Sequence, residues 1–439
     1  MRTVVTRSPV FALALSLVLV GTGCEPSSTA SVSLRNLAPA TPEDVGMSSE
    51  RLTLLHDAMQ GLVDEGRLAG ITTMIARSGR IADFQTYGFR DMAAGDSMTE
   101  DAIFRIFSMS KPITGVALMM LHEEGKFRLS DPVRRYIPEL ADMMVAASWG
   151  PDGPVLEDAD RPMTIRDLMT HTAGLAYGIG DPHPADRLYA RSGVLDMSGT
   201  LEDMIDKLAG LPLRFQPGTQ WSYSISVDVQ GYLVEVLSGQ PFDEFLQERV
   251  FDPLGMEDTG FHVPAESHGR FAQVYFYDDE GNLTPPPESD NAIVSMQFLE
   301  PATFFSGGGG LVSTTMDYMR FCQMLLNGGE LDGVRLLSPT TVDMIRTNHL
   351  PREMGEYAPG QGFGLDFSVV LDPVEAGSVS GGEYFWGGAA GTWFWIDPVE
   401  DLIFVGMIQQ FGGRVPDVRS LSRQLTYAAI TESRGQNHE

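Results

Sequence analysis

The amino-acid sequence predicts an α+β fold: a central antiparallel sheet built from the N- and C-terminal segments, flanked by helices, with a mostly helical inserted region. Two observations lead to this prediction. Runs of residues typical of β-strands occur near both ends of the chain, and the long stretch between them carries mainly helical patterns. Strands far apart in sequence, with helices between them, favour one sheet assembled from distant segments.

The N-terminal part of this plan is a helix followed by a hairpin. Residues 48–66, "SSERLTLLHDAMQGLVDEG", place a capping serine before apolar residues at helical spacing, namely Leu52, Leu55, Met59 and Leu62. Residues 70–88, "GITTMIARSGRIADFQTYG", are two β-prone runs around Ser78-Gly79-Arg80. Such a pair of runs around a turn predicts a hairpin.

The C-terminal part repeats this arrangement. Residues 391–410, "GTWFWIDPVEDLIFVGMIQQ", are two β-prone runs with Asp397-Pro398 opening the turn, and residues 418–430, "VRSLSRQLTYAAI", predict a closing helix. Two stretches rich in turn residues, 148–162 and 278–291, interrupt the middle of the chain. We interpret both as surface loops rather than lids.

The first residues are typical of an export signal. Arg2 and Arg7 precede an apolar run and then small residues that end at Cys24. A cysteine in this place favours a lipoprotein signal with a lipid on Cys24, although Gly21 stands where such signals usually have leucine. The alternative is an ordinary signal peptide cut near Gly23. We therefore predict a signal peptide at 1–23, a flexible tether at 24–40, one domain at 41–435, and a periplasmic or envelope-anchored bacterial protein.

Composition narrows the possible partners. The net charge of −29 argues against nucleic acid, because an acidic surface repels phosphate groups. The chain has 2 cysteines, and with Cys24 in the export segment Cys322 has no partner for an intrachain disulfide. No internal repeat or heptad pattern is present, so a monomer is the default expectation.

Ser108 and Lys111 form an S-x-x-K motif in "FRIFSMSKPITGVALMML", residues 104–121. Three residues of helical rise place the lysine amine beside the serine hydroxyl. The apolar run that follows predicts a buried helix, and burial can lower the pKa of a lysine enough for it to activate a serine. The alternative is that Ser108 only caps the helix, and the motif alone does not exclude this.

Three further segments make the pattern specific: Tyr223-Ser224-Ile225, Trp386-Gly387-Gly388 before a β-run, and "TIRDLMTHTAGL" at 164–175. Together with "SGGGGLVSTTMDYMRF" at 306–321, they make the chain resemble the serine β-lactamase and penicillin-binding-protein superfamily. Within it, the chain looks most like the family VIII carboxylesterases, which share the class C β-lactamase fold. The resemblance runs from about residue 41 to about residue 431 and implies a β-lactamase-like fold.

The resemblance implies a role for each matching residue. Ser108 is the acylated nucleophile, Lys111 its activating partner, and Tyr223 the residue that carries protons. A phenol ionises near pH ~10 in water, so it needs a nearby cation to act as a base, and Lys111 is the expected source. Trp386, Gly387 and Gly388 match the substrate-binding Lys-Thr-Gly strand. The backbone N–H groups of Ser108 and Ala389 would form the oxyanion hole.

Some residues depart from the family pattern. Ile225 stands where β-lactamases of this type have asparagine, and Trp386 replaces the lysine that holds an antibiotic's carboxylate, with no lysine after Lys207. An apolar side chain there favours neutral esters. We interpret Ser289-Asp290-Asn291, an S-D-N sequence in a Pro-rich loop, as a chance match.

We also leave His171 out of the catalytic set, because the resemblance gives its segment a structural role. "HEEG" at His122 lacks the second histidine of a zinc motif, so we expect neither a metal nor another cofactor.

The sequence therefore predicts an exported serine hydrolase, a carboxylesterase for short-chain or compact neutral esters. One alternative is a β-lactamase or D-amino-acid peptidase that acts on cell-wall-like substrates. The other is a non-catalytic binding module with the same fold.

Overall fold

The structure is a computed structural model of the chain, and it describes residues 1, 4, 35–151, 153–180, 183–286, 298–355, 357–412 and 415–435. Cys24 and Ser289-Asp290-Asn291 lie outside these residues. So do residues 24–34 of the predicted tether and, apart from residues 1 and 4, the predicted signal peptide.

A nine-stranded sheet forms the centre of the fold, with the order β1-β3-β2-β17-β16-β15-β14-β13 and β4 paired to β3. Its strands are β1 Ala38–Pro39, β2 Gly70–Arg77, β3 Arg80–Asp91, β4 Asp96–Ser97, β13 Gln361–Phe363, β14 Ser368–Val370, β15 Tyr384–Gly387, β16 Trp393–Asp397 and β17 Leu402–Met407. The antiparallel pair of β2 and β17 joins the two ends of the chain. The predicted α+β fold with a sheet built from distant segments is confirmed, and only the short β1–β3 pair is parallel.

The helices of the described residues are α1 Ser49–Asp64, α2 Ser110–Glu123, α3 Ile165–Met169, α4 Pro184–Ser192, α5 Leu201–Ala209, α6 Ser226–Ser238, α7 Phe242–Leu246, α8 Asp252–Leu254, α9 Thr315–Leu326, α10 Pro339–Ile345, α11 Pro373–Ala376 and α12 Val418–Ala428. The remaining strands are β5 Ile103–Arg105, β6 Val145–Gly150, β7 Gly153–Glu157, β8 Tyr275–Tyr277, β9 Leu283–Thr284, β10 Val312–Thr314, β11 Glu330–Leu331, β12 Val334–Arg335 and β18 Gln410–Phe411. None of the described helices is long and apolar enough to span a membrane.

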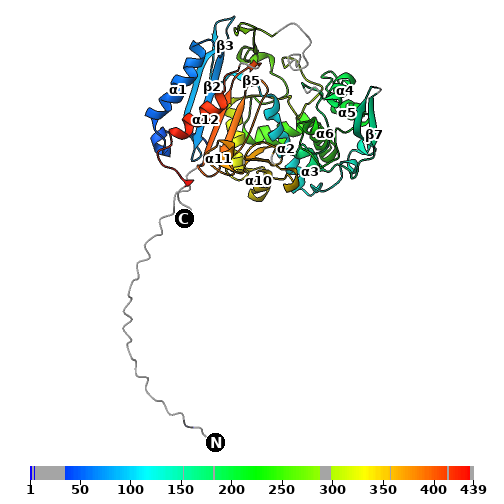
Figure 1. Cartoon of the computed structure of the whole chain (residues 1–439). Coiled ribbons are helices and arrows are strands. Elements are labelled where there is room, and N and C mark those ends of the chain that lie inside the picture. Colours follow the sequence, from blue (N-terminus) through cyan, green and yellow to red (C-terminus); the bar gives the residue numbers. More distant parts are fainter. Residues whose placement is uncertain are drawn as a thin grey trace. The chain divides into compact units, whose positions relative to one another are not determined.

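Two layers of helices cover the sheet. Helices α1 and α12 lie together on one face, and α9 contacts the other face along β2 and β17, on the side of the helical region with α2 to α6 (Figure 1). The predicted apolar face of α1 is buried over β3, in one hydrophobic cluster that includes Leu55, Trp395 and Phe404. The Ser48 side chain accepts a hydrogen bond from the backbone N–H of Arg51, as a capping serine does.

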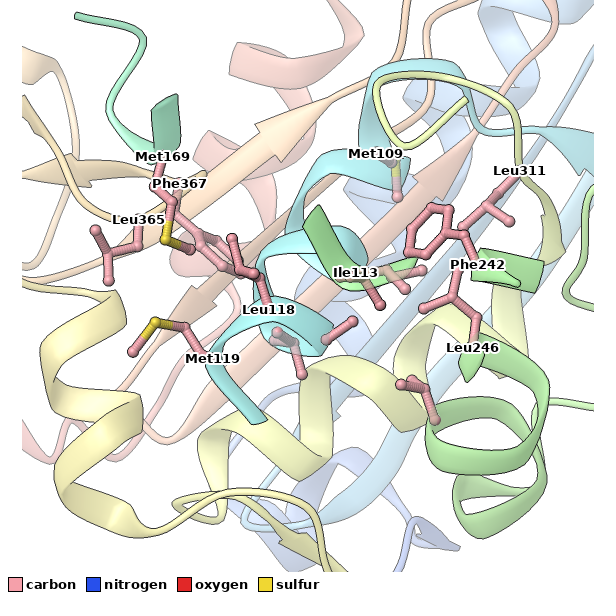
Figure 2. Packing of buried hydrophobic residues seen from close by; sticks show 14 of the residues in the cluster. Met109, Ile113, Leu118, Met119, Met169, Phe242, Leu246, Leu311, Leu365 and Phe367 are labelled. Atoms are coloured by element: carbon pink, nitrogen blue, oxygen red, sulfur yellow. The ribbon is translucent and has the colours of Figure 1, made fainter. Parts of the chain in front are cut away.

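Helix α2 lies in the middle of the second, larger cluster and is buried from Ser110 to Leu121. Figure 2 shows its side chains between Phe242 and Leu246 on one side and Leu365 and Phe367 on the other. A helix that is apolar nearly all round is stable only where other side chains cover it on every side. The expectation of a buried helix after Ser108 is therefore confirmed.

Residues 35–40, which we placed in the tether, belong to the folded unit, which begins at Arg35. Leu37 is buried in the main cluster, and strand β1 pairs with β3. The Arg35 guanidinium donates to Asn327 Oδ1 at 2.7 Å and to Asp401 Oδ2 at 2.7 Å. Composition alone suggested a linker, but one buried leucine and one paired arginine anchor this segment to the sheet.

The first turn-rich stretch, 148–162, is also not a plain loop. Part of it forms the antiparallel hairpin of β6 and β7. Of the second stretch, 278–291, the structure describes residues up to 286, and these include β9.

Candidate active site

Ser108 lies at the entrance to α2, in the short 3₁₀ helix Phe107–Met109. Helix α2 begins two residues later at Ser110, and its N-cap residue, Met109, makes no side-chain capping bond. The alternative that Ser108 only caps the helix is therefore wrong. Pro112 falls in the first turn, where backbone N–H groups have no partner within the helix, so it interrupts nothing.

The residue before the nucleophile has a strained backbone. Phe107 has φ +42°, a region that residues with a side chain rarely adopt. Its ring packs edge-on against Phe298 at 6.0 Å and Phe411 at 5.5 Å between ring centres, so tertiary packing holds the turn. Strain of this kind gathers at functional sites.

Lys111 is fully buried beside Ser108. Its Nζ donates to the Gly308 carbonyl at 2.6 Å, to the Tyr177 hydroxyl at 3.1 Å and to Ser108 Oγ at 3.4 Å. The S-x-x-K geometry therefore brings the two side chains together, with the lysine as the donor. A donated bond from the ammonium leaves the Ser108 proton free to be given to another acceptor.

The charge state of Lys111 differs from our expectation. Burial lowers the pKa of Lys111, but the interactions with Tyr177, Tyr223 and Asp228 outweigh burial, and the net pKa lies above its ordinary value. The raised pKa favours the ammonium form of Lys111, whereas desolvation alone would favour the neutral amine. Its charge acts on its neighbours instead.

A glycine strap, residues 306–310, closes over the lysine. Gly308 accepts from Lys111 through its carbonyl, and its N–H donates to Asp228 Oδ1 at 3.1 Å. A Cβ at Gly308 would lie 2.6 Å from Asp228 Oδ2, so only glycine fits here. Burial raises the pKa of Asp228, against the opposing charge of Lys111 and the bond from the Ser306 hydroxyl.

Tyr223 faces the same space. The Lys111 Nζ lies 4.5 Å from the centre of its ring, and the ring packs edge-on against Tyr177 at 5.2 Å between centres. The Tyr223 hydroxyl is buried and has no hydrogen-bond partner in the part of the chain that the structure describes. A buried phenol without a protein partner is available to a substrate.

His171 holds the segment of Tyr223 from both sides. Its carbonyl accepts from the Ser222 N–H at 2.9 Å, its Nδ1 lies 3.1 Å from Ser224 Oγ, and its ring centre is 4.9 Å from that of Tyr223. Burial, together with the charge of Lys111, holds the pKa of His171 well below its usual range. This enclosed imidazole packs against the tyrosine and holds its segment in place.

The predicted substrate-binding strand reaches the site through Trp386. Its ring centre lies 5.7 Å from that of Tyr223 and 5.5 Å from that of Phe363. At Gly388 an added Cβ would lie 2.4 Å from the Ile106 carbonyl oxygen. This glycine is therefore needed so that the strand can approach the turn that carries the nucleophile.

Gly387 faces a cation that the sequence did not lead us to expect. A Cβ at Gly387 would lie 2.7 Å from the Arg419 guanidinium, which donates to the carbonyls of Gly388 at 3.1 Å and Thr392 at 3.3 Å. Arg419 comes from the first turn of α12 and remains exposed. The strand is thus held by the helix behind it.

A hollow of about 220 Å³, which we call the catalytic hollow, lies beside Ser108 and Tyr223. Ser108, Tyr177, Tyr223, Gly308 and Ala389 all contribute to its wall, together with apolar side chains. The structure therefore brings the predicted nucleophile, the proton carrier and the second oxyanion residue to one cavity. Elsewhere, the described residues contain no group of three histidine, cysteine or acidic side chains placed to hold a metal ion.

Sequence reasoning missed Tyr177. It follows His171 by six residues in "HTAGLAYG", and its hydroxyl contacts Lys111 directly. No spacing rule connects a loop tyrosine to a lysine 66 positions earlier, so only the fold reveals the contact.

Comparisons with known proteins agree with this geometry. A family model described as Beta-lactamase matches residues 55–428. Protein Rv1367c of Mycobacterium tuberculosis is 39% identical over 365 residues, which cover 80% of this chain and 88% of that protein. Esterase EstB of Burkholderia gladioli is 35% identical over 347 residues, covering 75% and 83% respectively. The solved structure of EstCE1, described as a hydrolase with promiscuous acyltransferase activity, superposes with TM-score 0.73 at 27% identity, covering 87% of this chain and 99% of that one.

Proposed function

This chain belongs to the β-lactamase family of serine hydrolases, which includes esterases, and from that premise we propose that it is a carboxylesterase of the family VIII type. It cleaves short-chain or compact neutral esters through an acyl-enzyme on Ser108. The observation that carries the proposal is the contact of a buried lysine cation with Ser108 Oγ at 3.4 Å, inside a largely apolar hollow.

In the acylation step, Ser108 Oγ attacks the ester carbonyl carbon and gives its proton to Tyr223, which reacts as the phenolate. The carbonyl oxygen becomes an oxyanion, which the N–H groups of Ser108 and Ala389 stabilise. The Lys111 cation lies close enough to stabilise negative charge on the Tyr223 oxygen. When the tetrahedral intermediate collapses, the bond to the alcohol oxygen breaks, and Tyr223 returns the proton to that oxygen.

Deacylation repeats these steps with water. Tyr223 takes a proton from the water molecule as its oxygen attacks the acyl carbon, and then returns the proton to Ser108 Oγ as the acid leaves. No cofactor takes part, and the enzyme is regenerated in its starting state.

The wall of the catalytic hollow supports a neutral substrate. Trp386 stands where the resemblance would place a lysine, and the hollow is lined mainly by apolar and aromatic groups. An apolar wall favours an uncharged ester, because a buried carboxylate without a partner is costly.

One observation favours the alternative, a β-lactamase or D-amino-acid peptidase. The Arg419 guanidinium lies next to Gly387 and donates through one nitrogen to the carbonyls of Gly388 and Thr392, so its other N–H groups can pair with a carboxylate. This cation lies beside the strand in which Trp386 replaces the lysine of the family pattern. It makes an anionic cell-wall-like substrate the second candidate.

Side-by-side turnover of p-nitrophenyl butyrate, nitrocefin and a D-Ala-D-Ala peptide separates the two candidates. We expect the ester to be cleaved fastest, and faster nitrocefin turnover would overturn the choice. Labelling by a fluorophosphonate tests the enzyme against a binding module. We expect one label on the wild type and none on Ser108→Ala, and equal labelling of both would refute the nucleophile.

We further propose export with a lipid on Cys24. The support is the order of Arg2, Arg7, the apolar run and Cys24 in the sequence. Labelling of cells with radioactive palmitate tests it. The full chain should take up label and Cys24→Ala should not, and label on both proteins would contradict the proposal.

A further inference from the structure

We propose that a second hollow beside the catalytic one extends the substrate site and takes the apolar part of an uncharged ester too long for the catalytic hollow alone. This inference rests on the proposed esterase function and names a wider substrate class for it. The second hollow measures about 480 Å³, against about 220 Å³ for the catalytic hollow.

Two chain segments form walls of both hollows. The loop before α5 contributes Leu195 and Met197 to the catalytic hollow, and Met197 and Ser198 to the second one. The glycine strap does the same, with Gly309 in the catalytic hollow and Gly310 in the second. The two hollows therefore share the walls that these two segments form.

The strap is open at Gly309 and crowded at Gly310. At Gly309 the nearest atom to an added Cβ is a Phe107 backbone atom at 3.8 Å, whereas at Gly310 an added Cβ would lie 2.9 Å from the Ser306 carbonyl oxygen. Met197 is half-buried, lines both hollows, and is the one residue common to the two linings. A methionine is flexible and polarizable, so it can move aside as a chain passes.

The second hollow has an apolar wall with polar groups beside it. Phe261, Phe298 and Phe304 supply aromatic wall and Ala302 an aliphatic contact, and the polar lining residues are Ser198, Glu300 and Thr303. Glu300 is exposed at this hollow and disfavours an anionic group. An apolar alkyl chain or ring attached to the ester is the ligand class that satisfies both features.

Two substitutions test the inference from opposite directions. Thr303 lines the second hollow only and is exposed, so Thr303→Trp should fold and fill that space. Met197→Ala should widen the junction. Val374→Trp is the matched control, because Val374 is 89% exposed and lines neither hollow.

The measurement is kcat/KM for two long substrates, p-nitrophenyl octanoate and octyl acetate, each relative to its short counterpart, p-nitrophenyl butyrate or ethyl acetate. We expect Thr303→Trp to lower a long-to-short ratio by about tenfold and Met197→Ala to raise it, with no change in the control. The substrate that responds shows whether the acyl or the alcohol end enters the hollow. If neither variant changes either ratio relative to the control, the inference is wrong.

Binding to the Ser108→Ala protein separates this inference from the proposed function. Calorimetry should show tighter binding of methyl octanoate than of methyl butyrate, and Thr303→Trp in the same background should remove the difference. If the wild type cleaves no ester but this preference is found, the proposed esterase function is wrong and the proposed role of the second hollow is kept. Octyl acetate and ethyl acetate are compared in the same way, and equal binding of the long and the short ester in both pairs would overturn the hollow whatever the wild type cleaves.

Discussion

Tyr177→Phe removes one hydroxyl and leaves the aromatic ring in place. That hydroxyl accepts a bond from Lys111 Nζ at 3.1 Å, one of three such bonds that hold the buried cation. A hydrogen bond to a charged group contributes ~1.5 to 3 kcal/mol. If the loss of this bond raises the activation free energy by the same amount, kcat/KM falls by roughly 10- to 150-fold. The assay is p-nitrophenyl butyrate hydrolysis followed over pH.

The matched control is Tyr189→Phe, which deletes an equally buried hydroxyl in α4. That hydroxyl donates to the Pro212 carbonyl at 3.1 Å and does not touch Lys111. We expect Tyr189→Phe to lower stability modestly and to keep its activity. We expect Tyr177→Phe to lose activity and to keep its stability. If both variants show the same kcat/KM, Tyr177 does not hold the lysine for catalysis, and the reasoning fails.

Three further predictions concern stability and the approach of the strands. Asp228→Ala leaves a buried hydroxyl and a backbone N–H without their acceptor and should cost ~1 to 3 kcal/mol in urea unfolding, so an unchanged midpoint would count against it. Gly388→Ala should abolish ester turnover, since its Cβ would meet the Ile106 carbonyl, whereas Gly61→Ala in open space on α1 should stabilise by ~0.5 to 1 kcal/mol and stay active. The bond to Asp83 raises the pKa of His56, so His56→Gln should be less stable than the wild type. The difference in stability should be largest below pH ~6.5 and should disappear as the pH rises through the raised pKa. A difference in melting temperature between the two proteins that does not change with pH would refute this.

Much of the site could be predicted because its parts are local in sequence. Ser108 and Lys111 are three residues apart at a helix start, and the apolar run after them forms a helix that has to be buried. The two end hairpins carry their own turn signals, and their meeting at β2 and β17 follows from the need to bury apolar faces.

The remainder depends on contacts that no local pattern encodes. The protonated state of Lys111 arises from groups on three other segments, which outweigh the effect of burial. Tyr177 and the carbonyl of Gly308 reach the lysine from separate segments, and Arg419 reaches the strand from the last helix. Helix α2 begins at Ser110 because aromatic packing holds the turn at Phe107. The helix propensities of single residues do not predict such a contact.

The most direct test is to trap the covalent intermediate. The wild type is mixed with p-nitrophenyl butyrate, quenched in acid and digested, and the peptides are weighed by mass spectrometry, with Ser108→Ala and Ser110→Ala treated in parallel. We predict one butyryl group on the peptide that contains Ser108, in the wild type and in Ser110→Ala only. A butyryl group that persists in Ser108→Ala, or ester turnover by that variant at the wild-type rate, would contradict the account.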